Sequence, residues 1–297
     1  MRDTLQSTAA APVSEAAQPA PAPRRKRRRW PLAGLLGGVL VLFWLMMALF
    51  GPMVAPHEAG RIVDMDVFTP MTAKFPLGTD YLGRDMLSRI LHGARYTVGV
   101  ALLATLMASG SGLILGMSAA VWGGWLDMLV SRCLDTLSAM PSKMFALVVV
   151  AAFGSSVPVL VLSAGIIYTP GAYRIARSLA VGINAMDYVR IARARGESTA
   201  FIVREEILPN MTGPVLADFG LRFVFIVLLL SGLSFLGLGI QPPEADWGSL
   251  VRENIGGLAE GAPAVLMPAL AIASLTIGVN MLIDNLGGFR RRAGGEG

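Results

Sequence analysis

The sequence is poor in charged residues and in cysteine. Asp, Glu, Lys and Arg make up 15% of its 297 residues, whereas a typical soluble domain has about 25%. The single cysteine, Cys133, excludes an internal disulfide bond and a cluster of cysteine metal ligands. The two histidines, His57 and His92, lie far apart in the sequence and belong to no metal-binding motif. We therefore expect neither a disulfide-stabilised fold nor a metal site.

Motifs for catalysis and for nucleotide binding are also missing. The chain contains no Gly-rich dinucleotide fingerprint, no Walker A loop, no HExxH motif and no Gly-x-Ser-x-Gly elbow. The net charge of +5 comes from arginine clusters, and the largest, RRKRRR at residues 24–29, directly precedes an apolar run. This arrangement is typical of membrane anchoring rather than of nucleic-acid binding. We expect a protein that is not an enzyme, binds no cofactor and has no nucleic-acid partner.

Long apolar runs are the main feature of the chain. Hydrophobic residues make up 54% of the sequence, and the mean hydropathy is +0.60. A helix needs about 20 apolar residues to cross a bilayer. Runs near this length occupy roughly residues 31–52, 96–121, 128–153, 157–173, 213–238 and 263–286. We predict an all-α membrane protein with about six transmembrane helices.

The other segments divide the chain into regions of different composition. A kink or a break at Thr169, Pro170 and Gly171 is expected near the end of the fourth run. Asp85 can cap a short amphipathic helix before the second run. The predicted regions are a disordered basic tail (1–29), a first transmembrane helix (30–53), an outer segment (54–95), a five-helix core (96–286) that contains polar segments at 187–210 and 240–262, and a basic tail (287–297).

The distribution of Lys and Arg predicts the orientation of these helices. If the N-terminus is cytoplasmic, sixteen of these residues lie in cytoplasmic segments and six in outer segments. Positive charge accumulates on the cytoplasmic side of membrane proteins. We therefore predict that both termini and residues 187–210 are cytoplasmic.

Residues 187–210 form a polar stretch that must lie outside the bilayer. Asp187 can cap a first helix whose inner side carries Val189, Ala192 and Arg195, and Gly196 allows a sharp turn. Ser198 can cap a second helix, on which Phe201 and Ile202 are apolar, and Pro209 is expected to end it. We call residues 187–210 the docking loop. A partner protein and a lipid surface are both possible binding partners of such a helix pair.

Ionisable residues within apolar runs are candidates for a transport pathway. Asp218 and Arg222 are four residues apart, so they can pair on one helix face, and Asp135 can pair with Arg132 in the same way. These residues can either pair with one another or line a transport pathway, and the sequence leaves both alternatives open. The candidates are Asp135, Lys143, Asp218, Arg222 and Asp284.

Two further patterns concern packing. Gly112 and Gly116 make a small-xxx-small pair, which predicts close approach of a neighbouring helix. Asp80 and Asp85 lack the dense oxygen-ligand spacing of a calcium loop, so we interpret them as turn and cap residues.

Four stretches resemble a known family. YVRIARARG with ILPN in the docking loop resembles the cytoplasmic EAA loop of permease subunits of binding-protein-dependent ABC importers. Gly196 and Leu208-Pro209 stand at the family's Gly and Leu-Pro positions, whereas Arg190 replaces the usual first Glu. PLGTDYLGRDMLSRILHGAR, RCLDTLSAMPS and LSFLGLGIQPPEADWGSLVRE are similar to the second permease of the dipeptide, oligopeptide and nickel importers. The C-terminal IDNLGGFRRR differs from the family's usual end.

The resemblance implies a type I ABC importer permease in a bacterial inner membrane. It implies a homologous permease as partner, two ATPase subunits that carry ATP and Mg, and an extracytoplasmic solute-binding protein that meets residues 57–95 and 240–262. Di- or oligopeptides are the implied solutes, and nickel chelates, glutathione-like thiols and opine or sugar conjugates are alternatives. By resemblance, the ATPase-docking residues are Arg190, Ala192, Arg193, Ala194, Gly196, Phe201, Ile202, Leu208 and Pro209.

Two unrelated function classes make different demands on the sequence. A proton-coupled secondary transporter needs an acidic relay near the middle of the membrane, and an intramembrane enzyme needs a paired nucleophile and base. The sequence shows neither pattern clearly.

Overall fold

The structure, a computed structural model, describes residues 32–291, with side chains up to residue 285. The described residues contain no β-strand, only two isolated bridges, which confirms the predicted all-α class. The tail predicted at residues 1–29 lies outside the described residues. The helices are α1 (Leu32–Val54), α2 (Met86–Trp122), α3 (Gly124–Ser138), α4 (Ser142–Phe153), α5 (Val157–Asn184), α6 (Asp187–Ala194), α7 (Thr199–Phe201), α8 (Leu208–Phe235), α9 (Trp247–Glu253) and α10 (Pro263–Arg291).

Within residues 32–291, five helical segments are long and apolar enough to cross a membrane. The pair α3 and α4 is a sixth candidate, but its two helices are bent by 83° at the break between them. The third span predicted at residues 128–153 therefore consists of two helices rather than one. Pro141 lies at this break, and a proline disfavours helical backbone in the residue before it.

Helix α2 is longer than predicted. Asp85 caps it, as expected, by accepting a hydrogen bond from the Ser88 backbone N–H at 3.0 Å. The expected short amphipathic helix and the second transmembrane helix are, however, one continuous helix of 37 residues, about 55 Å long. No proline interrupts this part of the chain, so nothing ends the helix near residue 95.

Helix α5 continues past its predicted end at residue 173. Pro170 lies inside the helix, which runs on to Asn184, so of the two predicted alternatives, a kink or a break, the break is wrong. The residues that follow Pro170 pack closely on α2. A Cβ atom added at Gly112 would lie 2.4 Å from the Ala172 Cβ, and one added at Gly116 would lie 2.8 Å from the Ala176 Cβ. This packing confirms the predicted role of the glycine pair, and it holds the helix together beyond the proline.

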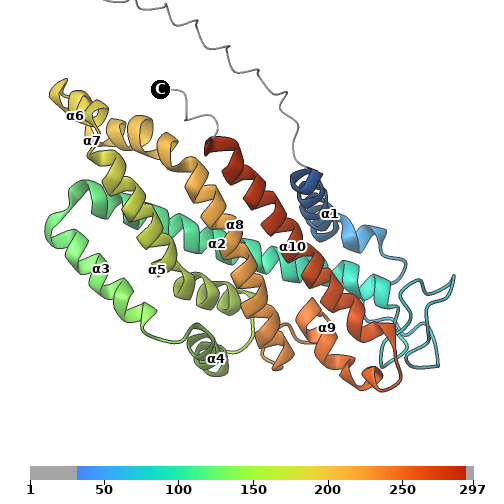
Figure 1. Cartoon of the computed structure of the whole chain (residues 1–297). Helices are drawn as coiled ribbons and strands as arrows, with labels where there is room; N and C mark the ends of the chain where they lie inside the picture. Colours follow the sequence, from blue (N-terminus) through green and yellow to red (C-terminus); the bar gives the residue numbers. More distant parts are fainter. Residues whose placement is uncertain (1–31, 292–297) are drawn as a thin grey trace, which may run out of the picture.

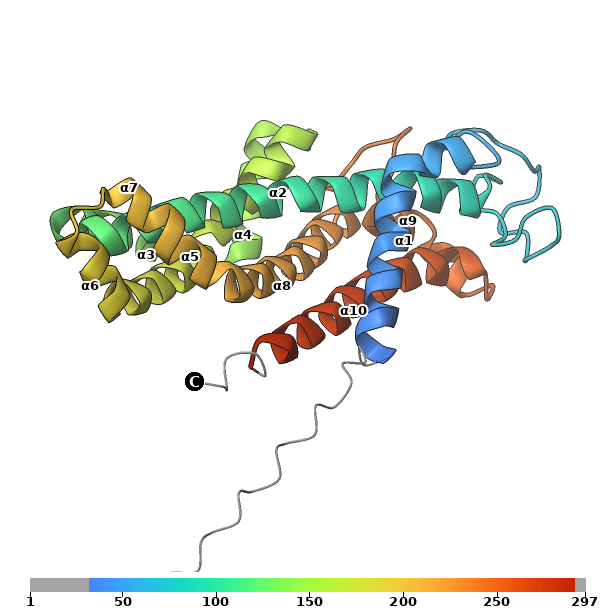
Figure 2. The ribbon, with the colours of Figure 1, turned by 90° about the horizontal axis from the view of Figure 1, so that it is seen from above.

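The docking loop and helix α9 lie at opposite ends of the bundle (Figure 1). Helix α1 lies across α10 and α2 (Figure 2) and approaches α10 closely at Gly37, where an added Cβ would be 2.7 Å from the Gly278 carbonyl oxygen. The Trp44 indole donates a hydrogen bond to Ser274 at 2.9 Å and packs edge-on against Trp247 at 4.6 Å. These contacts attach the first helix to the helical core.

Candidate functional site

The first helix of the docking loop, α6, begins without a side-chain cap. Met186 is the residue before the first turn, and Asp187 is already helical, so the expected Asp187 cap is wrong. The Asp187 carboxylate instead lies 3.6 Å from the Arg190 guanidinium. Both side chains are largely exposed, at 91% and 72%. An exposed ion pair of this kind contributes little to folding, so both groups remain available to a partner.

The turn after α6 has the predicted geometry. Gly196 has a φ of +83°, a conformation that glycine adopts readily and other residues rarely do. The Ser198 hydroxyl then accepts a hydrogen bond from the Phe201 backbone N–H at 3.2 Å, which confirms the predicted cap. The two helices of the docking loop are therefore joined by a sharply defined turn.

The predicted stop at Pro209 is wrong. A π-helical turn (Ile202–Ile207) follows α7, and α8 continues directly from Leu208 through Pro209. A proline lacks an N–H group and crowds the preceding turn, and a wider π-helical turn is one way for a helix to accommodate it. The second half of the docking loop is thus an extension of helix α8.

The inner side of the docking loop packs against the bundle. A cluster of buried apolar side chains joins α6 to α5 and α8, and we call it the loop anchor. Ala192 and Ile202, which the resemblance assigns to ATPase docking, belong to this anchor and are 0% and 2% exposed. The loop anchor consists of Ala176, Ala180, Val189, Ala192, Ile202, Ile207 and Met211.

The outer side of α6 combines apolar and basic side chains. Tyr188 is 41% exposed and Ile191 is 58% exposed. Arg195, expected on the inner side, is exposed. Arg193 donates a hydrogen bond to the Asn184 side chain at 2.7 Å, which ties α6 to the end of α5. Exposed aromatic, aliphatic and arginine side chains are characteristic of protein interfaces.

Within the bundle, the predicted pairing of Asp218 with Arg222 is confirmed. Their closest atoms are 2.6 Å apart, and Arg222 also donates to the Tyr168 carbonyl oxygen at 2.8 Å. Gly171 makes room for the guanidinium, since an added Cβ would lie 2.8 Å from it. This pair connects α8 to α5 and offers no free acidic group for a proton relay.

The other candidate pathway residues are exposed. The Asp135 carboxylate lies 4.0 Å from the Arg174 guanidinium rather than pairing with Arg132 as expected. Lys143 and Asp284 are also exposed. The structure therefore does not bring the predicted ionisable residues together into one site.

A polar contact between α3 and α5 was missed by sequence reasoning. Arg177 donates two hydrogen bonds to the Asp127 carboxylate, both at 2.6 Å, and the Tyr173 hydroxyl lies 2.7 Å from that of Ser131. Helix α3 has no buried residue, so these side chains supply much of its attachment to the bundle.

A buried charge network at the α9 end was also missed. Arg89 donates to the Asp80 and Glu253 carboxylates, both at 2.8 Å, and Arg84 donates to the same two groups at 2.7 and 3.3 Å. The Tyr81 backbone N–H also donates to Asn254 at 3.0 Å. We call Asp80, Arg84, Arg89 and Glu253 the outer ion cluster. It joins the two segments predicted to be extracytoplasmic, which are far apart in the sequence.

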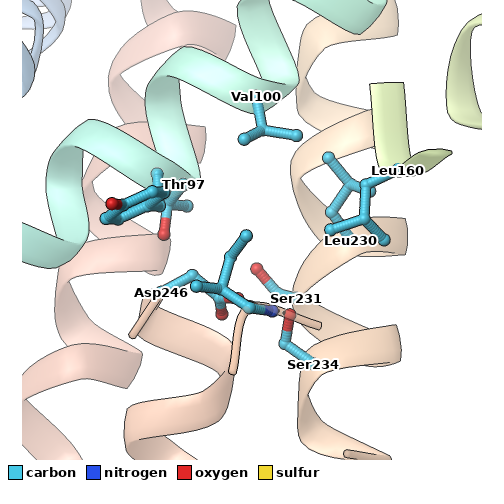
Figure 3. A pocket seen from close by; sticks show the side chains of 9 residues that line it. Thr97, Val100, Leu160, Leu230, Ser231, Ser234 and Asp246 are labelled. Carbon is cyan, nitrogen blue, oxygen red and sulfur yellow. Dashed lines mark hydrogen bonds between the residues drawn. The ribbon is translucent and has the colours of Figure 1, made fainter. Parts of the chain in front are cut away.

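A narrow pocket lies beside this end of the bundle (Figure 3). Its lining combines side chains of α2, α5 and α8 with Asp246, which precedes α9. The Asp246 carboxylate accepts hydrogen bonds from Ser234 at 2.6 Å and from the Ser249 backbone at 3.0 Å. Burial raises the pKa of this carboxyl, and its hydrogen bonds partly oppose the change. The space is only about 10 Å³, roughly the room that one water needs.

Comparison with known proteins identifies relatives over nearly the whole chain. Residues 112–292 match the family described as "Binding-protein-dependent transport system inner membrane component". The dipeptide transport system permease protein of Alkalihalophilus pseudofirmus is 30% identical, over 95% of this chain and 90% of its own. The di/tripeptide transport system permease protein of Pseudomonas aeruginosa is 32% identical, over 85% and 86%. The glutathione transport system permease protein of Pectobacterium atrosepticum is 31% identical, over 84% and 83%.

Proposed function

The chain belongs to the family of binding-protein-dependent transport system inner membrane components, and we propose that it is the permease subunit of an ATP-driven importer for di- or oligopeptides. The names of its relatives support this solute class, and a glutathione-like solute is the alternative that they also suggest. The solute would be delivered by an extracytoplasmic binding protein. A homologous permease would complete the translocation path.

The packing of the docking loop is the observation that carries this proposal. The loop anchor attaches α6 to α5 and α8 together, while Tyr188, Ile191 and Arg190 face outward. A partner that binds the outer side of α6 therefore moves both transmembrane helices when it moves α6. An ATPase subunit must move transmembrane helices in this way to reorient a translocation path. Its binding energy can shift the transporter between two states only through elements whose positions differ between those states.

The roles of the docking residues follow from their positions. Arg190, Arg193, Ala194 and Phe201 would contact the ATPase, and Ala192 and Ile202 would transmit the movement through the loop anchor. Gly196 sets the angle between α6 and the extension of α8. Leu208 and Pro209 lie where that extension enters the membrane helix. ATP and Mg would bind the partner ATPases and not this chain.

The orientation of the chain is part of the same proposal. The excess of Lys and Arg in the docking loop and in both terminal segments supports a cytoplasmic location for all three. The α9 end then faces outward and meets the solute-binding protein. A crossing by α3 and α4 together makes the number of spans even, which this orientation requires.

Substitution of Gly196 tests the docking role. A Cβ atom at Gly196 or at Gly182 meets nothing within 4 Å, but only Gly196 has a positive φ. Gly196→Glu should therefore distort the turn, whereas Gly182→Glu adds the same side chain without that strain. We expect Gly196→Glu to insert into the membrane normally, to lose co-purification of the ATPase subunits and to reduce peptide uptake at least tenfold.

Gly182→Glu is the matched control and should retain both properties. If Gly196→Glu co-purifies with its ATPases and takes up labelled dipeptide at the wild-type rate, the docking proposal is wrong. Uptake of labelled glutathione, but of neither dipeptide nor tripeptide, by the wild-type complex would replace the proposed solute class with the alternative one.

A further inference from the structure

A hollow of about 410 Å³ opens at the α9 end of the bundle. This volume is within the range of small-molecule sites. Three parts of the chain meet there: the start of the membrane-embedded part of α2, the junction of α4 with α5, and the connection from α8 to α9. The lining residues are Tyr96, Ser155, Ser156, Val157, Ile240, Gln241 and Glu244.

The lining is rich in hydrogen-bond acceptors and carries one charge. Glu244 is the only charged residue among the seven that line the hollow. Its carboxylate interacts with the Tyr96 hydroxyl and, within the described residues, has no Lys, Arg or His partner within 4.0 Å. The neighbouring Arg95 is exposed and does not line the hollow.

The Gln241 side chain adds another acceptor. Its Nε2 donates to the Gly237 and Gly239 carbonyl oxygens at 3.1 and 2.8 Å, so its amide oxygen is the group left to bind a ligand. A carboxylate, an amide oxygen and hydroxyl groups together suit a ligand with a positive charge and several N–H donors. A primary ammonium group has three such donors.

The inner boundary of the hollow is closed. Tyr96 and Ile240 line both this hollow and the narrow pocket of Figure 3, so they lie between the two spaces. Since the narrow pocket has room for only about one water, a solute stops at these two side chains. Asp246, which is 6% exposed, lies on the far side of these two side chains.

We propose that this hollow binds the amino-terminal ammonium group of the solute, with Glu244 as its ion-pair partner and Tyr96 and Gln241 as orienting groups. The hollow selects a free amine before the path opens. This inference rests on the proposed function, because it takes the solute to be a peptide that enters from the α9 end.

The test compares two solutes in the assembled transporter. Complexes with the wild-type chain, with Glu244→Gln or with Glu260→Gln are reconstituted in vesicles with the same ATPases and binding protein. Initial uptake rates are measured for a dipeptide and for its N-acetylated form, each at a saturating concentration. Since only the permease changes, a change in the ratio of the two rates reports on the permease. Glu260 is the control because it is an exposed carboxylate of the same segment that does not line the hollow.

We expect Glu244→Gln to lower the ratio of dipeptide to N-acetyl-dipeptide uptake about tenfold, as loss of a charge-assisted hydrogen bond predicts. Glu260→Gln should leave the ratio at its wild-type value. An unchanged ratio in Glu244→Gln, or an equal fall in Glu260→Gln, overturns the inference and leaves the proposed function intact. If the wild-type complex takes up neither peptide, the proposed function is wrong and the inference is wrong with it.

Discussion

The two ends of the bundle use the same kinds of charged residue in opposite ways. In the outer ion cluster, the Arg89 and Asp80 side chains are 1% and 0% exposed, whereas in the docking loop Arg190 and Asp187 are 72% and 91% exposed. The buried pairs with Glu253 join residues that are more than 150 positions apart, whereas the exposed pair joins neighbours on one helix. The charges of one end therefore hold the fold together, and those of the other remain free for a partner.

Buried apolar side chains, rather than charged ones, hold the docking loop in place. The docking loop is held by the seven-residue loop anchor, whose members are at most 3% exposed. At the α9 end, hydrogen bonds and ion pairs connect segments that are rich in turns. Substitution of a charge should consequently lower stability more at the α9 end than at the α6 end.

Arg89→Ala should give the largest change in stability. It removes the side chain that contacts two buried carboxylates, and breaking a buried pair in this way costs about 3–5 kcal/mol in unfolding free energy. Thermal unfolding in detergent measures the change. Arg61→Ala, at an exposed position of the same outer segment, is the control and should stay within about 0.5 kcal/mol of wild type. Equal effects of the two substitutions would remove the contrast between buried and exposed charges.

Asp246→Asn should change how stability at the α9 end depends on pH. The folded-state pKa of Asp246 is raised above its unfolded value of 3.8 because burial disfavours the ionised form. The folded state then binds the proton more tightly than the unfolded state, so wild-type stability decreases as pH rises from 3.8 to the folded-state pKa.

The Asn variant lacks this titration. The advantage of wild type over Asp246→Asn should therefore grow as pH falls through that window, by at most about 1.4 kcal/mol per pH unit. The test is to measure the unfolding free energy of both proteins between pH 4 and pH 7. The titration of other groups is the same in both proteins and cancels in the difference. A difference that is constant with pH would show that Asp246 titrates normally.

Arg190→Glu should give the smallest change. Both partners of the Arg190 and Asp187 pair are exposed, so loss of the pair should alter unfolding free energy by less than about 0.5 kcal/mol. The substitution also restores the residue type usual in the family, and we expect co-purification of the ATPases to persist. Loss of docking by Arg190→Glu would show that Arg190 has an ion-pair partner on the ATPase. Arg190→Ala would then distinguish loss of that ion pair from repulsion between the new Glu and the ATPase.

Local sequence rules predicted the features that depend on near neighbours. The caps by Asp85 and Ser198, the turn at Gly196, the packing glycines Gly112 and Gly116, and the pairing of Asp218 with Arg222 all follow from spacings of a few residues, and the structure confirms each. Each of these predictions needed only the backbone geometry of one helix or turn.

The incorrect predictions share a different cause. The break at Pro170 and the stop at Pro209 do not occur, because packing on α2 and a π-helical turn accommodate the prolines. The contact of Arg89 with Glu253 and that of Arg177 with Asp127 depend on which helices become neighbours, which local spacing cannot reveal. The hollow around Glu244 was missed for the same reason, since its lining comes from three separate parts of the chain.

The unbroken passage of the chain through Pro209 has a mechanical consequence. Residues Thr199–Phe235 form one helical span of 37 residues, about 55 Å from end to end. One end of this helix is in the docking loop, and Ser234 near the other end is hydrogen-bonded to Asp246 in the lining of the narrow pocket. A movement of the docking loop would therefore displace the Ser234 end through one continuous helix. No series of side-chain rearrangements between the two ends is needed.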